Sequence, residues 1–265
     1  MPNPTYHVVV FRLAVALAFV PLNCRVGVTQ TVQKLEGTYL GITTNLEAAR
    51  PLSASMLIDS QENRQFDGLL DIEAEDGIGT LYKSVIGTIA ASGNCVIQAD
   101  GLDGKSVLSL DWTKIDSAGL LVGKVVINHE EQFRPLALLR PFSDLSVNWG
   151  GGVTISMPVK FMSAFTGKVS ELPLQITGGT IGVMEAEYIE QETLMRMLLT
   201  TNRDGHFAGI SVTESSTYVL EGQVKFDDFG NPGTLLGSYS NFSITGKLID
   251  AGSVELWTSF EETEK

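Results

Sequence analysis

The sequence predicts a mainly β protein made of two duplicated antiparallel β-meander modules, each a barrel or a strongly curved sheet, with few short helices. Three observations predict this fold class: an internal repeat, short stretches in which apolar and polar residues alternate, and turn-forming clusters between them. Strands separated by about 8–12 residues, with such turns between them, are typical of all-β sandwiches and barrels. The alternative architecture is one larger closed sheet to which each copy contributes half.

The internal repeat places one pattern at two positions that are 141 residues apart. Residues 37–68 contain Gly-x-x-Leu-Gly-Ile, then Met-Leu-Ile, then Phe-x-Gly. Residues 178–209 contain Gly-x-x-Ile-Gly-Val, then Met-Leu-Leu, then Phe-x-Gly. Similarity at a fixed offset indicates a duplicated structural unit. The repeat therefore predicts one β module over residues 29–128 and a second over residues 173–265, with a connector over residues 129–172.

Alternation of apolar and polar residues predicts strands in both modules. The even-numbered positions of residues 66–73 are Phe, Gly, Leu and Ile, and those of residues 218–226 are Tyr, Leu, Gly, Val and Phe. Successive side chains of a strand point to opposite faces, so these segments fit half-buried strands. The connector is rich in Pro and Gly, and we expect two strands inside it, near residues 153–157 and 159–165.

Two segments favour helical structure. Residues 184–199 consist largely of strong helix formers, so we expect a short helix over Glu185–Glu192 followed by a strand. The segment Asn45–Arg50 fits a single helical turn, because Asn45 can cap its start and Pro51 stops it.

Residues 1–28 predict a signal peptide. Arg12 precedes an apolar run, Leu13–Val20, which is followed by Pro21 and small residues. The run is too short to span a bilayer, so we expect no transmembrane segment in the mature chain, which would be secreted, periplasmic or on the cell surface. A lipid anchor on Cys24 is the less favoured alternative, because the residues before it are not the usual small ones.

The charge of the chain limits its partners. The formal net charge is −13, and removal of the two leader arginines would leave 16 basic against 31 acidic side chains. Such a chain repels phosphate groups, which argues against nucleic acid and against anionic lipid as partners. Without the leader, Cys95 is the one remaining cysteine, so no internal disulfide is expected.

No motif in the sequence predicts catalysis, a metal or a cofactor. The nucleophile elbow, the phosphate loop and the dinucleotide-binding pattern are all missing from the sequence. His129 precedes two glutamates, but neighbouring residues of a strand point to opposite faces and cannot converge on one ion. An enzyme that uses isolated carboxylates such as Glu73 or Glu255 ranks last among the functions considered, because the sequence places no two groups to tune each other's pKa.

One short segment resembles a known family. Residues 35–39, Leu-Glu-Gly-Thr-Tyr, resemble the Gly-x-Trp signature that opens lipocalin-type calycin barrels, with Tyr39 in the position of the Trp. The resemblance implies an eight-stranded meander barrel that binds a small apolar ligand. It covers Gly37-Thr38-Tyr39 and a few neighbours, and the second copy lacks the aromatic residue.

These observations predict an exported, non-catalytic binding protein that holds a small apolar ligand in a β-barrel. Aromatic residues usually pack in a core, but inward-pointing ones can line the cavity of a barrel. The candidate ligand-binding residues are Tyr39, Phe66, Trp112, Phe207 and Trp257. The alternative is a structural or adhesive surface protein that uses its duplicated β modules to bind a protein partner, and a filled barrel interior would favour it.

Overall fold

The computed structural model describes residues 34–45, 50–73, 80–89, 94–99, 106–115, 118–125, 134–145, 155–180, 182–190, 192–226 and 232–257. All of them belong to one compact unit of the chain, residues 32–265. The expected signal peptide, residues 46–49 of the expected helical turn, and His129 with the two glutamates after it lie outside the described residues. Within the described ranges, no helix has the length and apolar character needed to cross a membrane.

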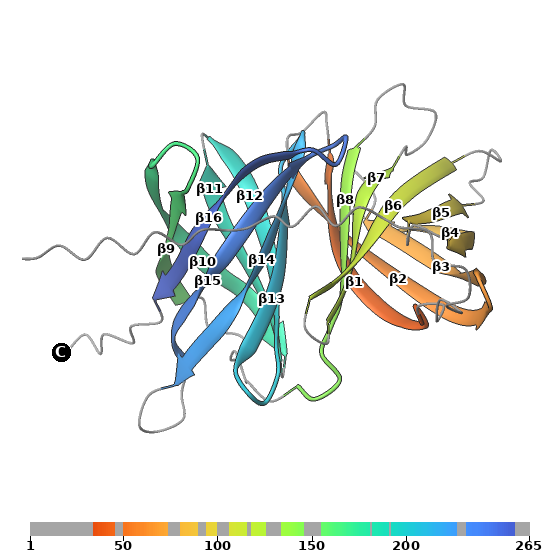
Figure 1. The fold of residues 1–265 in the computed structure, drawn as a ribbon, viewed down its shortest axis with the longest axis horizontal. Helices are drawn as coiled ribbons and strands as arrows, with labels where there is room; N and C mark the ends of the chain where they lie inside the picture. The colour runs from red at the N-terminus through yellow and green to blue at the C-terminus, as the bar shows by residue number, and fades with distance from the viewer. Residues whose placement is uncertain are drawn as a thin grey trace, which may run out of the picture. The chain divides into compact units, whose positions relative to one another are not determined.

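The first barrel is a closed ring of eight antiparallel strands that follow one another in chain order (Figure 1). It closes because β1 pairs with β8 as well as with β2. Its strands are β1 (Gly37–Asn45), β2 (Arg50–Glu62), β3 (Gln65–Glu73), β4 (Thr80–Ile89), β5 (Asn94–Ala99), β6 (Ser106–Ile115), β7 (Ala118–Val125) and β8 (Arg134–Arg140).

The second barrel has the same plan, and it closes because β9 pairs with both β10 and β16. The prediction of two antiparallel meander modules is therefore confirmed, and the alternative of one sheet shared by both halves is wrong. The strands are β9 (Ile155–Ser163), β10 (Val169–Thr180), β11 (Val183–Glu190), β12 (Thr193–Thr201), β13 (His206–Val212), β14 (Ser216–Phe226), β15 (Pro232–Ser243) and β16 (Leu248–Trp257).

The stretch expected to connect the modules contributes strands to both barrels. β8 supplies the last strand of the first barrel, while β9 and the beginning of β10 belong to the second. Short apolar runs interrupted by proline thus form strands here, and Pro135 and Pro158 lie within β8 and β9.

The repeated pattern occurs in two hairpins with the same register. Met56 of β2 faces Leu70 of β3, and the residues 141 positions later, Met197 of β12 and Ser211 of β13, also face each other. These hairpins nevertheless occupy different places, since β2 and β3 are the second and third strands of their barrel while β12 and β13 are the fourth and fifth of theirs.

An offset of 118 residues relates the barrels strand for strand at the place where each one closes. Gly41 of β1 faces Leu138 of β8, and 118 residues later Val159 of β9 faces Leu256 of β16. The 141-residue offset is therefore wrong as a correspondence between whole modules. In both copies of the pattern the phenylalanine lies over a glycine of the next strand, Phe66 over Gly87 and Phe207 over Gly222.

The helix expected over Glu185–Glu192 is also wrong. This segment forms most of β11 and the turn to β12, and Glu192 has a φ of 68° in that turn. Met184, Ala186 and Tyr188 are buried, while Glu185 between them is exposed. Pairing of β11 with β10 and β12 on a half-buried surface outweighs the helix propensity of the individual residues.

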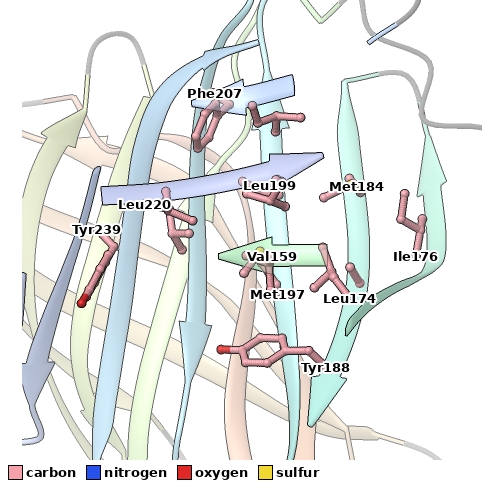
Figure 2. Close-up of a cluster of buried hydrophobic side chains, with 14 of the residues drawn as sticks. Val159, Leu174, Ile176, Met184, Tyr188, Met197, Leu199, Phe207, Leu220 and Tyr239 are labelled. Carbon is pink, nitrogen blue, oxygen red and sulfur yellow. The ribbon is translucent and has the colours of Figure 1, made fainter. Parts of the chain in front are cut away.

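Apolar side chains pack inside each barrel. In the second barrel they come from all eight strands, and Figure 2 shows labelled members such as Val159, Leu199 and Leu220 pointing toward one another. In the first barrel the buried cluster includes Met56, Leu70 and Leu138.

A third apolar cluster joins the outer faces of the two barrels. The first barrel contributes Ile42, Leu120, Ala137, Leu139 and the following Phe142, and the second contributes Leu198, Ala208, Ile210 and Val212. Strands at this junction are buried on both faces, so β8 and β13 are almost continuously buried. This two-sided burial explains their nearly unbroken apolar sequences.

Candidate functional site

The candidate aromatic residues do not share one ligand site among the described side chains. Tyr39 and Phe66 belong to the core of the first barrel and Phe207 to the core of the second, with exposed fractions of 0%, 2% and 0%. Trp112 and Trp257 lie on β6 and β16, and their side chains are outside the described part of the structure.

The contacts of these aromatic side chains are those of core residues. The Tyr39 hydroxyl donates a hydrogen bond to the Leu35 carbonyl oxygen at 2.8 Å, next to the predicted signature. The ring of Phe66 covers Gly87 of β4, where a Cβ atom would come within 2.0 Å of it. Phe207 covers Gly222 of β14 in the same manner. Both phenylalanine rings therefore fill the space beside a glycine, which has no side chain of its own.

A groove of about 350 Å³ lies between the barrels. Its lining comes from β1, β2 and β3 on one side and from β11 and β12 on the other. It is both polar and apolar, and the residues that line it are Leu40, Gly41, Ser53, Ala54, Ser55, Asp71, Glu73, Glu185, Arg196 and Leu198. We call it the inter-barrel groove.

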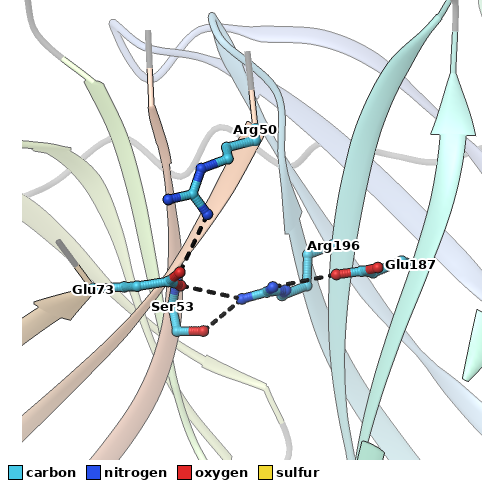
Figure 3. Close-up of polar contacts among 5 residues, drawn as sticks. All are labelled: Arg50, Ser53, Glu73, Glu187 and Arg196. Carbon is cyan, nitrogen blue, oxygen red and sulfur yellow. Dashed lines mark hydrogen bonds and ion pairs between the residues drawn. The ribbon is translucent and has the colours of Figure 1, made fainter. Parts of the chain in front are cut away.

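An alternating series of charges crosses the inter-barrel groove (Figure 3). Arg50 Nη1 lies 3.2 Å from Glu73 Oε1, and Arg196 Nη1 lies 3.7 Å from Glu73 Oε2. Arg196 Nη2 in turn lies 3.2 Å from Glu187 Oε1, and its Nη1 donates a hydrogen bond to Ser53 Oγ. Arg196 is therefore the cation that links the carboxylates of the two barrels.

The surroundings of Glu73 keep its carboxyl group ionised. Partial burial alone would raise its pKa, but the Ser53 backbone N–H donates to it at 3.0 Å, and Arg50 and Arg196 lie close by. Together these groups hold the pKa of Glu73 below its ordinary value. The charge series therefore stabilises the junction and leaves Glu73 unsuited to act as an acid.

Two other carboxylates line the groove without a described partner. Asp71 Oδ1 is buried and accepts no hydrogen bond from any described residue. Glu185 is exposed on β11, across the groove, and no described side chain forms a hydrogen bond or an ion pair with it. Within the described residues, no group of three or more His, Cys, Asp or Glu side chains could hold a metal ion.

An apolar row begins next to the groove on the outer face of the first barrel. Leu57 of β2 faces Leu69 of β3, and Ile86 of β4 is diagonal to that pair. Their exposed fractions are 39%, 48% and 61%. The pair directly before Leu57 and Leu69 on this face is Ser55 with Asp71, both of which line the groove. The groove and the apolar row thus form one continuous surface.

Four aromatic rings gather at one end of the second barrel. This end holds the turns that join β9 to β10, β11 to β12, β13 to β14 and β15 to β16. Phe161 lies 5.4 to 6.4 Å from Tyr188, Tyr218 and Tyr239, measured between ring centroids. Phe161 and Tyr218 are partly exposed. The Tyr239 hydroxyl donates to Asp250 Oδ2 at 2.8 Å, so the cluster combines rings with an anchored carboxylate.

Burial keeps these phenols neutral. It raises the pKa of Tyr218 to about 12, with the nearby Glu190 and Asp250 carboxylates adding to the effect. Burial also raises the pKa of Tyr188 and of Tyr239, where the hydrogen bond to Asp250 acts in the same direction. The three hydroxyl groups can therefore serve as hydrogen-bond donors and not as bases near neutral pH.

Comparisons with known proteins do not assign a family. No family model matches the chain, and no curated protein matches it. One solved structure that matches is a porin-like protein from Bacteroides uniformis ATCC 8492, with 10% identity and a TM-score of 0.20, over 83% of this chain and 96% of that chain. At such a TM-score the similarity supports no inference about this chain.

Proposed function

We propose that the protein is an exported, non-catalytic surface protein that binds a protein partner through the outer faces of its barrels. The observation that carries this proposal is the apolar packing of the described side chains inside both barrels. Tyr39, Phe66 and Phe207, which were expected to line a ligand cavity, pack in two separate apolar cores. These three large side chains occupy part of the space that a small apolar ligand inside a barrel would need.

The outer surface offers features that suit a partner. The apolar row of Leu57, Leu69 and Ile86 is exposed, although such side chains usually pack inside a protein. It continues into the inter-barrel groove, which adds charged side chains to the same surface. A combination of apolar side chains with a polar rim is typical of protein-binding surfaces.

Site-specific photo-crosslinking in the cells that naturally make the protein tests this proposal. A photoreactive amino acid would replace Ile86, and in a matched control it would replace Glu171, an exposed residue of β10 outside the groove. We expect a covalent adduct of one fixed mass from position 86 and none from position 171. The same adducts from both positions, or none from position 86, would contradict a partner at this surface.

A second candidate function is the binding of a small ligand at the aromatic end of the second barrel. It is supported by the partly exposed rings of Phe161 and Tyr218, which lie 6.1 Å apart beside neutral tyrosine hydroxyls. Native mass spectrometry of the protein, purified gently from its own host, tests this candidate. A bound molecule of fixed mass that is lost from Phe161→Ala would support it, and a mass that stays free of ligand after exposure to lipid extract would reject it.

A further inference from the structure

We propose that one end of the second barrel docks on a phospholipid surface without net charge, and that two matched turns insert between its headgroups. The first turn joins β9 to β10 and the second joins β15 to β16. With their flanking residues, 162–169 and 243–249, we call them the paired tips. They share no residue with the inter-barrel groove or the apolar row, so this inference goes beyond the proposed function.

Exposed apolar side chains gather at this end of the barrel. Among the described residues, eleven large apolar side chains are exposed, and seven of these lie in or beside the turns of this end. The paired tips alone contribute five. Single exposed apolar residues are ordinary, but such a concentration marks a contact with a protein or a membrane. The seven residues are Met162, Phe165, Val169, Ile189, Leu194, Leu248 and Ile249, with exposed fractions of 39–59%.

The paired tips repeat one sequence and one backbone arrangement. Residues 165–169 are Phe-Thr-Gly-Lys-Val, and residues 244–248 are Ile-Thr-Gly-Lys-Leu. The two glycines have φ angles of 70° and 79°, and their N–H groups donate to the carbonyl oxygens of Ser163 and Ser243. The N–H groups of these serines donate to the carbonyl oxygens of Lys168 and Lys247, at 2.9 and 2.8 Å. The backbone thus holds the tips in a fixed shape, which lowers the entropy cost of a contact.

Hydrogen bonds hold the paired tips beside each other. β9 pairs with β16, and past the last paired residues the Ala164 N–H donates to the Ala251 carbonyl oxygen at 2.8 Å. Ser163 Oγ also donates to Asp250 Oδ1, at 2.7 Å. In Figure 1 both turns lie at the upper edge of the second barrel. A peptide segment usually binds in a groove or along a sheet edge, whereas projecting turns suit a soft surface that they can enter.

The charges of the paired tips suit lipid headgroups. Their charged residues are two exposed lysines, Lys168 and Lys247, and they contain no acid, although the chain has a net charge of −13. The charge of Lys168 also acts on Glu190 of β11, so one acid borders this surface. Lysine stems can lie on apolar chains while their ammonium groups reach phosphate oxygens.

The charge of the whole chain decides which lipid fits. A strongly acidic protein is repelled by the negative potential of an anionic bilayer. A zwitterionic bilayer has no such potential, but it still offers phosphate oxygens to the two lysines and acyl chains to the apolar side chains. Phosphatidylcholine is therefore the probe that matches the paired tips.

Flotation with phosphatidylcholine vesicles tests the proposal. The protein used is residues 29–265, the mature form expected from the sequence, so the apolar leader cannot contribute. We expect the wild type to float with the vesicles. Phe165→Ser should lower the partition coefficient about tenfold, because the ring no longer leaves water on binding. The matched control is Phe226→Ser, which removes an exposed ring from the opposite end of the same barrel and should float as the wild type does.

Three flotation results would overturn the proposal. They are a wild type that does not float, equal flotation of Phe165→Ser and Phe226→Ser, and stronger flotation with phosphatidylglycerol than with phosphatidylcholine. Phe165 is 59% exposed, so its substitution leaves the core intact. Urea denaturation of the variant checks this, and Ile249→Ser, which should weaken flotation about fivefold, repeats the test at the second tip.

Two further measurements separate lipid from the other possible occupants. Analytical ultracentrifugation without lipid should show a monomer, and a dimer that Phe165→Ser abolishes would assign the tips to a second copy of the chain. A photoreactive residue at position 165 should react with lipid, and an adduct with one protein would assign the tips to a protein partner. A crosslinked partner at position 86 without flotation would refute this inference and leave the proposed function standing.

Discussion

Arg196 of the second barrel and Glu73 of the first form an ion pair across the junction, with 3.7 Å between Nη1 and Oε2. The side chains are 19% and 24% exposed, so solvent screens the pair only in part. Each member also contacts a further charge of its own barrel, Glu187 for Arg196 and Arg50 for Glu73. The junction thus combines an apolar contact with one specific polar connection.

Replacement of Arg196 by methionine should destabilise the protein. The change leaves Glu187 without its guanidinium partner and Glu73 with Arg50 alone, so we expect a loss of about 1–3 kcal/mol in the free energy of unfolding. Urea denaturation measures it. The control Arg50→Met, at a more exposed position, should cost less than about 1 kcal/mol. Equal losses of unfolding free energy in the two variants would show that the ion pair between the barrels stabilises the protein no more than the pair of Arg50 with Glu73 does.

The lowered pKa of Glu73 predicts acid sensitivity. A carboxyl group whose pKa is lower in the folded state stabilises the fold at neutral pH, and that contribution disappears as the pH falls below its unfolded value of 4.5 and through its folded value. Glu73→Gln should therefore be less stable than the wild type at neutral pH, and the difference should shrink as the pH falls. Denaturation at a series of pH values measures this, and a difference independent of pH would refute it.

Gly222→Ala should strongly destabilise the second barrel. A Cβ atom there would lie 2.3 Å from the Leu236 carbonyl oxygen and 2.8 Å from the Phe207 ring, so backbone as well as side chain must move. We expect a loss of about 2 kcal/mol or more, measured by chemical denaturation. Gly178→Ala is the matched control, because its nearest neighbour would be a Glu185 oxygen at 3.5 Å. A similar loss in both variants would contradict the steric explanation.

The phenol of Tyr218 should ionise late. Burial, together with the Glu190 and Asp250 carboxylates, raises its pKa from 10.0 to about 12. Because the unfolded chain releases this proton first, the stabilising contribution is complete below pH 10.0 and is lost as the pH rises through about 12. Tyr218→Phe should remove a phenolate absorbance step near that pH. If the substitution instead removes an absorbance step near pH 10.0, the phenol of Tyr218 ionises at its ordinary pKa and is not shielded from solvent.

The sequence was sufficient to predict a mainly β chain of two antiparallel meanders, because alternation with period two is a local property. It did not predict β8, which lies in the expected connector. It also contained the evidence against the helix at Glu185–Glu192, since buried Met184, Ala186 and Tyr188 occupy every second position. Strand pairing outweighs helix propensity there.

The inter-barrel groove could not be predicted in the same way. In the sequence Glu73 is an isolated carboxylate, and its partner Arg196 is 123 residues away on another barrel. Their meeting depends on how two outer faces pack, which no local periodicity encodes. The surroundings of two aromatic candidates also depend on neighbouring strands, since Phe66 and Phe207 fill the space over glycines there.

The apolar cluster between the barrels has a consequence for how the chain unfolds. Ile42, Leu120, Phe142 and Ile210 are each no more than 2% exposed because the other barrel or its flanking segment covers them. Loss of one barrel would expose this surface on the other, so partial melting is unfavourable. The two barrels should therefore melt in a single cooperative transition, and either barrel expressed alone should self-associate through its uncovered face.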